Sequence, residues 1–507
     1  MPIQHAFVFA PGRERLLTSV VYCVFTLLLA AATGCEKPGV PVTGEKTGAT
    51  DGQSETSITT AFANKQHIVV VTYNDGTNSA QTIQYTDTTR KILPGASLMG
   101  WSYSLDEGQT WTYGGKVQPP AGTGWSVLWG DPASTTSDAA YNYVFIANLA
   151  IPTSKMPPGG IDGAVIVSGA DSYIGGACIA RSTNGGITFE AYQCVSNTTK
   201  NNVPNSEKGH FYDGGSMASS TQGDIYAAFV DVTTSQIDVW RSPSVNGNFA
   251  QLAPPFPNMS MSSHPRLRVN HADGTLYVAA QASNSAVYIN RFANGQWGAP
   301  VAASNPGVIY PKIAFKSGLD VRTGPQFSFD IGGASDESGN DAIRVMYTDF
   351  DEEKKRFYVT GSYCSRTLSG CWAAPEWGTT PGNLNTPGDQ FNPNVKAWAG
   401  FIGLPPIWKA SYLDRDGAPN DSVTLRQGNL AYFPDGGRIF LPFAVIPDKP
   451  VCPDNRGYWG DYNDMAHLGF KEDVAQFIVA LSDSSQGCDK RQTYDSHHLH
   501  VRSVVFP

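Results

Sequence analysis

The 507-residue sequence predicts an all-β fold built from repeated small sheets. It is rich in residues that form tight turns, with 52 Gly and 34 Pro, and 11% of its residues are aromatic. Short apolar segments recur along the chain, and none continues with the period of about 3.6 residues that marks an amphipathic helix. These observations indicate many short strands joined by turns.

The N-terminal segment, residues 1–34, has the features of an export signal. Arg13 and Arg15 form a basic region, and a mainly apolar run follows from Leu16 to Ala32. This run is short for a membrane span. The sequence Ala32-Thr33-Gly34-Cys35 looks like a bacterial lipobox, in which the thiol of Cys35 receives the lipid. Glu36, rather than Asp, follows Cys35, which favours the outer membrane over the inner one.

Residues 35–57 are expected to form a flexible tether. After Cys35 this stretch is mostly Gly, Thr, Glu, Lys, Pro and Ser, a composition that cannot build an apolar core. The remaining residues, 58–507, are predicted to form a single domain. No later segment is long and apolar enough to suggest a transmembrane helix, so only the lipid is expected to hold the protein at a membrane.

The domain contains seven copies of one strand pattern. In each copy a polar, aromatic or Pro-containing entry precedes a strand and a Gly-containing turn, and a strongly apolar strand follows. The copies are spaced by about 50 to 85 residues. The apolar strands are expected at 67–71, 143–146, 225–229, 276–279, 343–347, 407–412 and 475–479.

Two eight-residue segments share a second, sharper pattern. Residues 104–111 read Ser-Leu-Asp-Glu-Gly-Gln-Thr-Trp, and residues 182–189 read Ser-Thr-Asn-Gly-Gly-Ile-Thr-Phe. In both, Ser and Asp or Asn can bond the local backbone, and Gly permits a positive φ. Thr then leads into the next strand, and the aromatic side chain is expected to be buried under the turn.

These two segments resemble the Asp-box, or BNR repeat, of the sialidase superfamily. The resemblance implies a β-propeller of four-stranded blades, with the boxes lying away from the active-site face. The seven strand copies favour seven blades over the six that are usual in sialidases. The resemblance also has a gap: the Arg-Ile-Pro motif of catalytic sialidases is not found before the first box.

In a propeller, the entries to the innermost strands would converge at one mouth of the channel. They are found at residues 129–132, 212–214, 264–266, 325–327, 392–394 and 459–462. The C-terminal strand is expected to close the ring against the N-terminal module, which would remove exposed sheet edges.

The cysteines fit an exported protein with disulfides. The chain has eight, and six remain once Cys23 in the signal and Cys35 are set aside. Six cysteines allow many connectivities. Pairing between sequence neighbours would join Cys178 to Cys194, Cys364 to Cys371 and Cys452 to Cys488. No C-x-x-C spacing occurs, and no metal site or cofactor is predicted.

Three polar clusters are candidates for the functional site. Tyr458, Asp461 and Tyr462 could supply the phenol and carboxylate of sialidase-like nucleophilic catalysis, with Trp459 contacting the substrate. They could equally be a structural entry motif. His210, Tyr212 and Asp213 form the second cluster, with possible general acid and base roles, or they lie in a channel-lining turn.

The third cluster is a pair of arginines, Arg266 and Arg268. Strand alternation puts both on the same face, where they could hold the carboxylate of a sialic or uronic acid. The alternative is that they pair with the protein's own acids.

Three functions therefore remain open: a sialidase-like glycosidase acting on acidic glycans, a lyase of uronate polysaccharides, or a non-catalytic binding or scaffold propeller. The net charge of −9 argues against a nucleic-acid partner. A lipid-anchored monomer in the bacterial cell envelope is expected.

Overall fold

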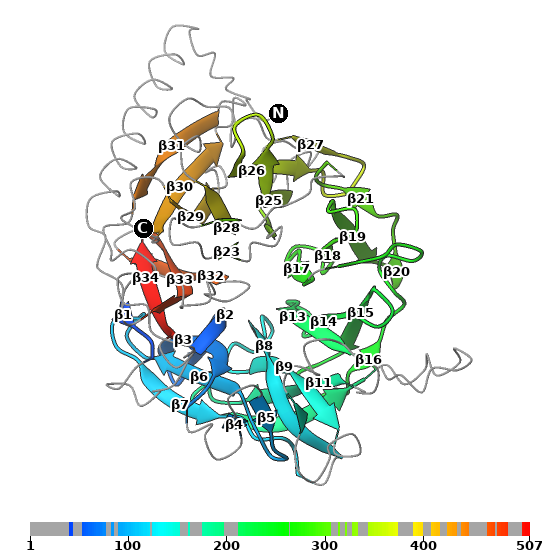
Figure 1. The fold of residues 1–507 in the computed structure, drawn as a ribbon, viewed down its shortest axis with the longest axis vertical. Helices are drawn as coiled ribbons and strands as arrows, with labels where there is room; N and C mark the ends of the chain where they lie inside the picture. Colours follow the sequence, from blue (N-terminus) through cyan, green and yellow to red (C-terminus); the bar gives the residue numbers. More distant parts are fainter. Residues whose placement is uncertain are drawn as a thin grey trace, which may run out of the picture.

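In the computed structural model the chain forms a seven-bladed β-propeller (Figure 1). The inner strands of the blades line a central channel. The structure describes residues 40–43, 53–77, 83–85, 90–121, 124–152, 161–162, 175–196, 211–262, 264–305, 313–314, 320–321, 327–332, 343–373, 389–398, 407–415, 423–432, 438–445, 464–471, 474–484 and 499–506. These residues include no helix, and hence none that is long and apolar enough to cross a membrane.

Each blade is an antiparallel sheet whose first strand lies nearest the channel. Blade 1 contains β2 (Gln53–Ala63), β3 (Gln66–Asp75), β6 (Met99–Ser104) and β7 (Thr112–Lys116). Blade 2 contains β8 (Trp125–Thr136), β9 (Val144–Pro152), β11 (Gly176–Ser182) and β12 (Glu190–Val195). Blade 3 contains β13 (Tyr212–Ser219), β14 (Ile225–Asp231), β15 (Gln236–Ser242) and β16 (Ala250–Gln251).

The other blades follow the same order. Blade 4 contains β17 (Arg266–Val269), β18 (Leu276–Gln281), β19 (Val287–Ala293) and β20 (Gln296–Trp297), with β21 (Val301–Ala302) also paired to β19. Blade 5 contains β24 (Phe327–Ile331), β25 (Ile343–Asp351), β26 (Arg356–Cys364) and β27 (Cys371–Ala373). Blade 6 contains β28 (Gln390–Trp398), β29 (Ile407–Asp414), β30 (Thr424–Tyr432) and β31 (Arg438–Val445).

Blade 7 joins the two ends of the chain. It contains β32 (Asp464–Lys471), β33 (Val474–Ser484), β34 (Leu499–Phe506) and, as its outermost strand, β1 (Val40–Pro41). Two small sheets lie outside the blades. They consist of β4 (Ile83–Tyr85), β5 (Arg90–Ile92) and β10 (Ile161–Asp162), and of β22 (Ile313–Ala314) and β23 (Asp320–Val321).

The prediction of seven blades is confirmed. The seven apolar segments predicted from the sequence coincide with the second strands of the blades, β3, β9, β14, β18, β25, β29 and β33; only Tyr143 of segment 143–146 falls outside, one residue before β9. These strands are apolar along most of their length because both of their faces are covered by neighbouring blades. In β14, for example, every residue from Ile225 to Asp231 is buried.

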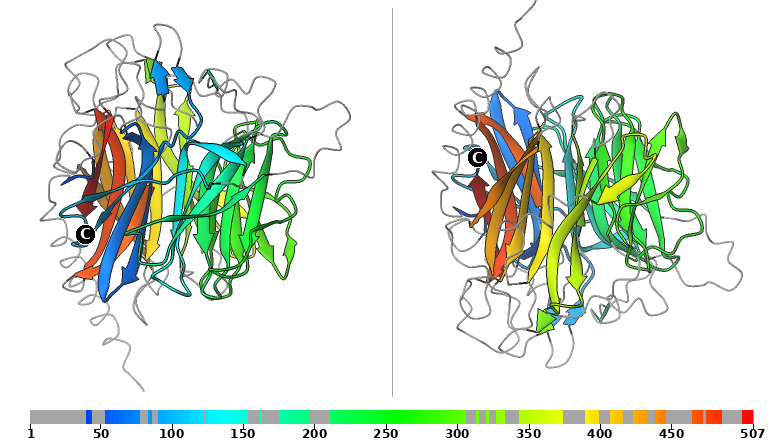
Figure 2. Two further views of the ribbon diagram at one scale, coloured as in Figure 1. Left: turned by 90° about the horizontal axis from the view of Figure 1, so that it is seen from below. Right: turned by 90° about the horizontal axis from the view of Figure 1, so that it is seen from above.

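The hydrophobic core is divided among the spaces between blades. The buried clusters each combine side chains from adjacent blades; one joins Ile225 and Phe229 of blade 3 to Phe145 of blade 2, and another joins Val69 of blade 1 to Ile478 of blade 7. The side views in Figure 2 show the blades stacked side by side in this way. Fully burying one such side chain contributes about 1.5–3 kcal/mol, so each inter-blade layer is a substantial part of the stability.

The ring is closed by the N-terminal strand, and this corrects the tether expected at residues 35–57. Val40 and Pro41 pair with Ser503 and Arg502 of β34, so the C-terminal strand does meet the N-terminal segment. In addition, β2 begins at Gln53, whose side chain is fully buried. The polar composition of residues 35–57 did not predict these two strands. Strand pairing uses backbone N–H and C=O groups, which a polar segment supplies as well as an apolar one.

The two eight-residue segments form nearly identical turns between the third and fourth strands of blades 1 and 2. The hydroxyl of Ser104 accepts the amide of Gly108 at 2.8 Å, and the hydroxyl of Ser182 accepts the amide of Gly186 at the same distance. Asp106 accepts the Thr110 amide at 2.8 Å, and Asn184 accepts the Thr188 amide at 3.0 Å. The turns therefore have a structural role at the periphery.

Two related turns were missed in the sequence. Ser242 and Phe249 in blade 3, and Ser365 and Trp372 in blade 5, have the same seven-residue spacing between Ser and an aromatic residue. The Ser365 hydroxyl accepts the amide of Ser369 at 2.9 Å, as in the first two turns. Neither segment has Asp or Asn at the third position, so the spacing alone was the available signal.

Two of the three expected disulfides are present. Cys178 bonds Cys194, and Cys364 bonds Cys371; each joins directly opposed residues of the third and fourth strands of one blade. Cys452 and Cys488 lie outside the described residues. Cys35 and the rest of the signal segment lie outside them as well.

The closing strand yields the first prediction. In a chain that begins at residue 45, β34 would lose its pairing with β1 and its contact with the buried side chain of Val42. It would also lose the hydrogen bonds that the backbone amides of Val42 and Thr43 donate to the Val501 carbonyl. Unfolding free energy should fall by about 3 kcal/mol or more. The measurement is chemical denaturation, with a chain that begins at residue 37 as the control. Equal stability of the two chains would show that β1 does not hold the ring closed.

Candidate functional site

The central channel contains a cavity with a volume of about 770 Å³. Inner strands from all seven blades line it. The inward positions are small or polar, in contrast to the apolar second strands behind them. Around the ring they include Ser57, Ser134, Ser216, Arg268, Asp330, Lys396 and Asp464. A hollow of this kind, lined by polar groups that converge from several elements, is the default candidate for a ligand site.

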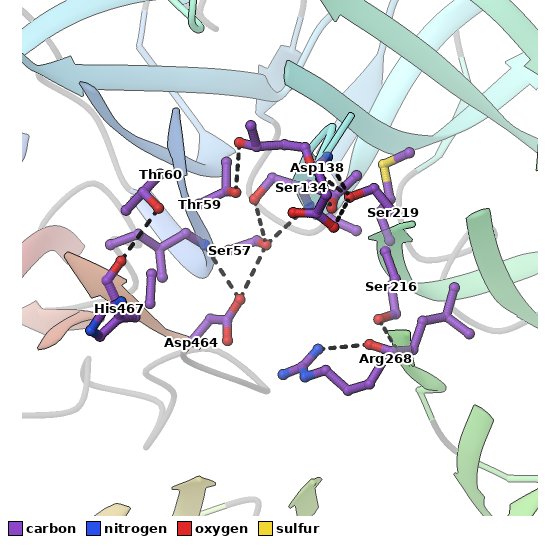
Figure 3. A pocket seen from close by; sticks show the side chains of 18 of the residues that line it. Ser57, Thr59, Thr60, Ser134, Asp138, Ser216, Ser219, Arg268, Asp464 and His467 are labelled. Carbon is purple, nitrogen blue, oxygen red and sulfur yellow. Dashed lines mark hydrogen bonds between the residues drawn. The ribbon is translucent and has the colours of Figure 1, made fainter. Parts of the chain in front are cut away.

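Neighbouring inner strands are joined through side-chain hydroxyls (Figure 3). The hydroxyls of Ser57 and Ser134 lie 2.9 Å apart, and those of Thr59 and Thr136 also lie 2.9 Å apart. The amide of Leu267 donates to the hydroxyl of Ser216 at 2.9 Å. Residue numbers rise together along paired strands, so the inner strands run in parallel. The channel therefore has an entry end, where these strands begin, and an exit end, where they finish.

Several inner strands carry a bulge near the entry end. The pairing register shifts at Ser54/Ser57 in β2, Gly130/Ala133 in β8, Asp213/Gly215 in β13 and Phe391/Asn394 in β28. Within the bulges, Glu55, Asp131 and Asn392 have φ of 54° and Gly214 has φ of 49°. Positive φ is uncommon for non-Gly residues, and bulges often re-aim side chains beside functional sites.

The bulges bring a cluster of titratable groups together at the entry end. One ligand atom each from Asp131, Asp213 and His264 lies within 4.8 Å of the others. The amide of Gly214 donates to Asp131 at 3.1 Å and to Asp213 at 3.0 Å. Gly214 is required here, because a Cβ atom would come within 1.7 Å of the His264 ring.

Glu55 completes this entry cluster. Asn74 donates to the Glu55 carboxylate and accepts the amide of Asp131 at 2.9 Å. Burial, together with the neighbouring carboxylates of Glu55 and Asp213, raises the pKa of Asp131 well above its usual range. A protonated Asp131 can donate a hydrogen bond to either neighbour and so relieve the repulsion between carboxylates.

The same donor set could hold a divalent cation. Two carboxylates and an imidazole are ligands used by Zn²⁺ and Mn²⁺ sites. The sequence pattern gave no sign of this, because Asp131, Asp213 and His264 belong to three different blades.

The middle of the channel carries the cations. Arg266 and Arg268 of β17 line it, while Leu267 between them is fully buried on the other face. Arg268 pairs with Asp330 of β24 at 3.1 Å. Burial and the positive charge of Arg268 lower the pKa of Lys396 on β28, against the opposing effect of Asp330 and Asp464. Three cations and two carboxylates thus interact within this part of the channel.

The predicted site residues divide into three groups. Arg266 and Arg268 line the channel cavity, and Asp213 lies in the entry cluster with Asp131 and His264. Tyr212 does not: it is 1% exposed, stacks on Phe229 at 5.4 Å and donates to Asp238 at 2.9 Å in the core between blades 2 and 3. His210, Tyr458, Trp459, Asp461 and Tyr462 lie outside the described residues.

The position of Tyr212 corrects its proposed catalytic role. Burial and the nearby Asp238 raise the pKa of its phenol far above the usual range, so the phenol stays protonated, and its burial keeps it away from any substrate in the channel. Strand alternation gives the reason, because Tyr212 and Asp213 point to opposite faces of β13. A lyase that uses Tyr212 for proton abstraction is therefore not supported.

Three residues were not predicted from the sequence: Lys396, which lines the cavity, and Glu55 and Asp131 of the entry cluster. Glu55 was assigned to the tether, and Asp131 was seen only as part of a strand entry. One usable signal was the repeat of Gly-Asp-Pro at 130–132 and Phe-Asn-Pro at 391–393, where Pro follows the residue of positive φ.

No protein-family model matches this sequence, and no curated protein matches it. Solved structures resemble it in fold. The BP39L lectin from Burkholderia pseudomallei has 13% identity and a TM-score of 0.47, over 90% of this chain and 96% of the lectin. The Fusarium graminearum GH93 α-L-arabinofuranosidase has 10% identity and a TM-score of 0.41, over 93% and 97%. A Hadza microbial sialidase has 13% identity and a TM-score of 0.39, over 80% and 68%.

The entry cluster yields the second prediction. With its pKa raised in the folded state, Asp131 stays protonated where the unfolded chain has already ionised. Wild-type stability should therefore fall as pH rises above about 4 toward the folded-state pKa. Asp131→Asn keeps the shape of the side chain but removes its ionisable proton. The variant should therefore be more stable than wild type at pH 8, and the difference in unfolding free energy should vanish near pH 4.

The measurement is chemical denaturation between pH 4 and 8 with a chelator present, so that bound metal does not contribute. Asp224→Asn, in the Arg241 ion pair away from the entry cluster, is the control. A loss of stability in Asp131→Asn at pH 8 would show that Asp131 is ionised and needed in that form.

Proposed function

We propose that the protein binds an acidic carbohydrate in the central channel of the propeller. The observation that carries the proposal is the gathering of Arg266, Arg268 and Lys396, from two different inner strands, on the wall of one polar cavity. Guanidinium groups bind carboxylates through two parallel hydrogen bonds. A cavity of about 770 Å³ has room for a sugar ligand rather than a single ion.

The channel wall also suits the neutral parts of such a ligand. Hydroxyls of Ser57, Ser134, Thr59 and Thr136 alternate along β2 and β8 and can donate to or accept from sugar hydroxyls. The overall charge of −9 does not oppose an anionic ligand, because the local field of the channel cations acts on it at close range.

A second candidate function is hydrolysis of the bound glycan. It is favoured by the pairing of a carboxyl group of raised pKa, Asp131, with a second carboxylate, Asp213, at the entry end of the inner strands. Glycosidases use such a pair, with the protonated group as general acid and the ionised one as base or nucleophile. Release of reducing sugar from a glycan that binds would separate this enzyme from a binding protein.

The binding proposal is tested by the third prediction. Arg266→Ala should weaken binding of a sialic-acid or uronic-acid oligosaccharide by about 2–5 kcal/mol, the usual effect of removing one partner from a buried charge pair. Arg266→Lys should retain part of the affinity, because it keeps the charge but loses the two-pronged geometry. Titration calorimetry gives both values.

The control for this test is Arg241→Ala, which removes an arginine paired with Asp224 at 2.8 Å outside the channel. That variant should bind as wild type. If Arg266→Ala binds the acidic glycan normally while its melting temperature falls, then Arg266 is structural and a scaffold role for the propeller becomes the better interpretation.

We further propose that the protein is exported and anchored by lipid on Cys35, with the outer membrane as the favoured location. The support is the basic and apolar signal segment and the Ala-Thr-Gly-Cys sequence that ends at Cys35. An N-terminal cysteine that carries more than one acyl chain would hold the propeller stably near the membrane surface.

The fourth prediction follows from this proposal. Cys35→Ala should abolish incorporation of labelled palmitate and move the protein from the membrane fraction to the soluble fraction of the envelope. Cys23→Ala, which changes a cysteine inside the signal, is the matched control and should leave both readouts unchanged. Continued membrane binding of cleaved Cys35→Ala protein would refute lipid anchoring at this residue.

A further inference from the structure

Two exposed aromatic side chains stand at the exit end of the channel. Phe62, near the end of β2, is 52% exposed, and Tyr141, in the connection from β8 to β9, is 55% exposed. The amide of Phe62 donates to the carbonyl of Tyr141 at 3.0 Å, so the two backbones are held together. Both residues line the channel cavity.

Their exposure distinguishes this place from the rest of the described surface. Five large apolar side chains are exposed among the described residues: Phe62, Leu105, Tyr141, Val232 and Trp372. Of these, Phe62 and Tyr141 lie at the cavity and the others do not. An aromatic ring left in water beside a cavity is available to cover the apolar face of a ligand.

The polar groups beside the rings are held in fixed positions. The Asp138 carboxylate accepts the Ser219 hydroxyl at 2.6 Å, and His271 lies 3.4 Å from the same carboxylate. The Thr136 carbonyl lies at 2.6 Å from the same Ser219 hydroxyl and is the alternative acceptor for its single proton. The exit end therefore combines exposed rings with an ordered acceptor and hydroxyls, as Figure 3 shows for Asp138 and Ser219.

This combination matches the chemistry of a neutral sugar ring. A pyranose has an apolar face of C–H groups, which can stack on an aromatic ring, and an equatorial rim of hydroxyls, which can donate to a carboxylate. Ser57, beside Asp464 in the middle of the channel, and Phe62 are five positions apart on β2. At about 3.3 Å per residue, the exit end lies roughly 17 Å from the middle, a distance that a sugar chain can span.

We propose that Phe62 and Tyr141 form a second carbohydrate subsite, which binds a neutral pyranose of the same glycan whose acidic residue lies at Arg266, Arg268 and Lys396. The inference rests on the proposed function and adds the direction of the ligand to it: the glycan extends through the channel toward the exit end. Longer acidic glycans should therefore bind more tightly than their acidic terminal sugar alone.

The test compares three ligands by titration calorimetry: an acidic oligosaccharide, its acidic monosaccharide, and the matched neutral oligosaccharide. In Phe62→Ala and Tyr141→Ala, the dissociation constant for the acidic oligosaccharide should rise at least tenfold, while that for the monosaccharide stays within twofold of wild type. Tyr141→Phe, which keeps the ring, should bind as wild type. Trp372→Ala, an exposed aromatic outside the cavity, is the control.

The outcomes separate this inference from the proposal on which it rests. If both alanine variants bind the acidic oligosaccharide as wild type does, the subsite is refuted while acidic-glycan binding stands. If the alanine variants lose affinity for the monosaccharide as much as for the oligosaccharide, the two rings maintain the structure of the channel rather than contact a sugar. The subsite is then also refuted. Binding of the neutral oligosaccharide that depends on Phe62 but not on Arg266 would support the subsite and refute recognition of the acid.

Discussion

The hydrogen bonds between neighbouring inner strands are the interaction on which the rest of the structure depends. Inner strands of adjacent blades belong to different sheets, so no backbone ladder joins them. Side chains make the connection instead, as between Ser57 and Ser134, and between Asp330 and the amide of Ala397 at 2.8 Å. These contacts fix the spacing of the blades and, with it, the width of the channel.

The same requirement shapes the candidate site. Positions that hold the ring together must be small and polar, so the channel wall is hydrophilic before any ligand is considered. Apolar burial is moved outward to the layers between blades, where residues such as Val69 and Ile478 pack. The division leaves the inner wall free to carry the charged groups of Arg268, Asp330 and Lys396 at little cost to the core.

Bulges at the entry end add a second constraint. Each bulge places a residue at positive φ and shifts the pairing register of an inner strand. Such a conformation costs conformational free energy, and a repeat with a purely structural role has no need to incur that cost in four blades. In blades 1 to 3 the result is the convergence of Glu55, Asp131 and Asp213. Side chains of unlike character thus occupy successive levels along the inner strands: carboxylates at the entry end, cations with two paired carboxylates in the middle, and aromatic rings at the exit end.

The sequence by itself determined the all-β class, favoured seven blades over six and offered the pairing of two disulfides between sequence neighbours, because these depend on local patterns. An apolar second strand such as 225–229 must be buried on both faces, and Cys178 and Cys194 flank one hairpin. Strand alternation was also sufficient to orient Arg266 and Arg268. Only the tertiary structure decided that Tyr212 is core, that Asp131 meets Asp213 and His264, and that residues 40–41 complete blade 7. Those outcomes depend on which blades become neighbours and on register shifts in single strands, and neither is encoded in a pattern that a local stretch of sequence can display.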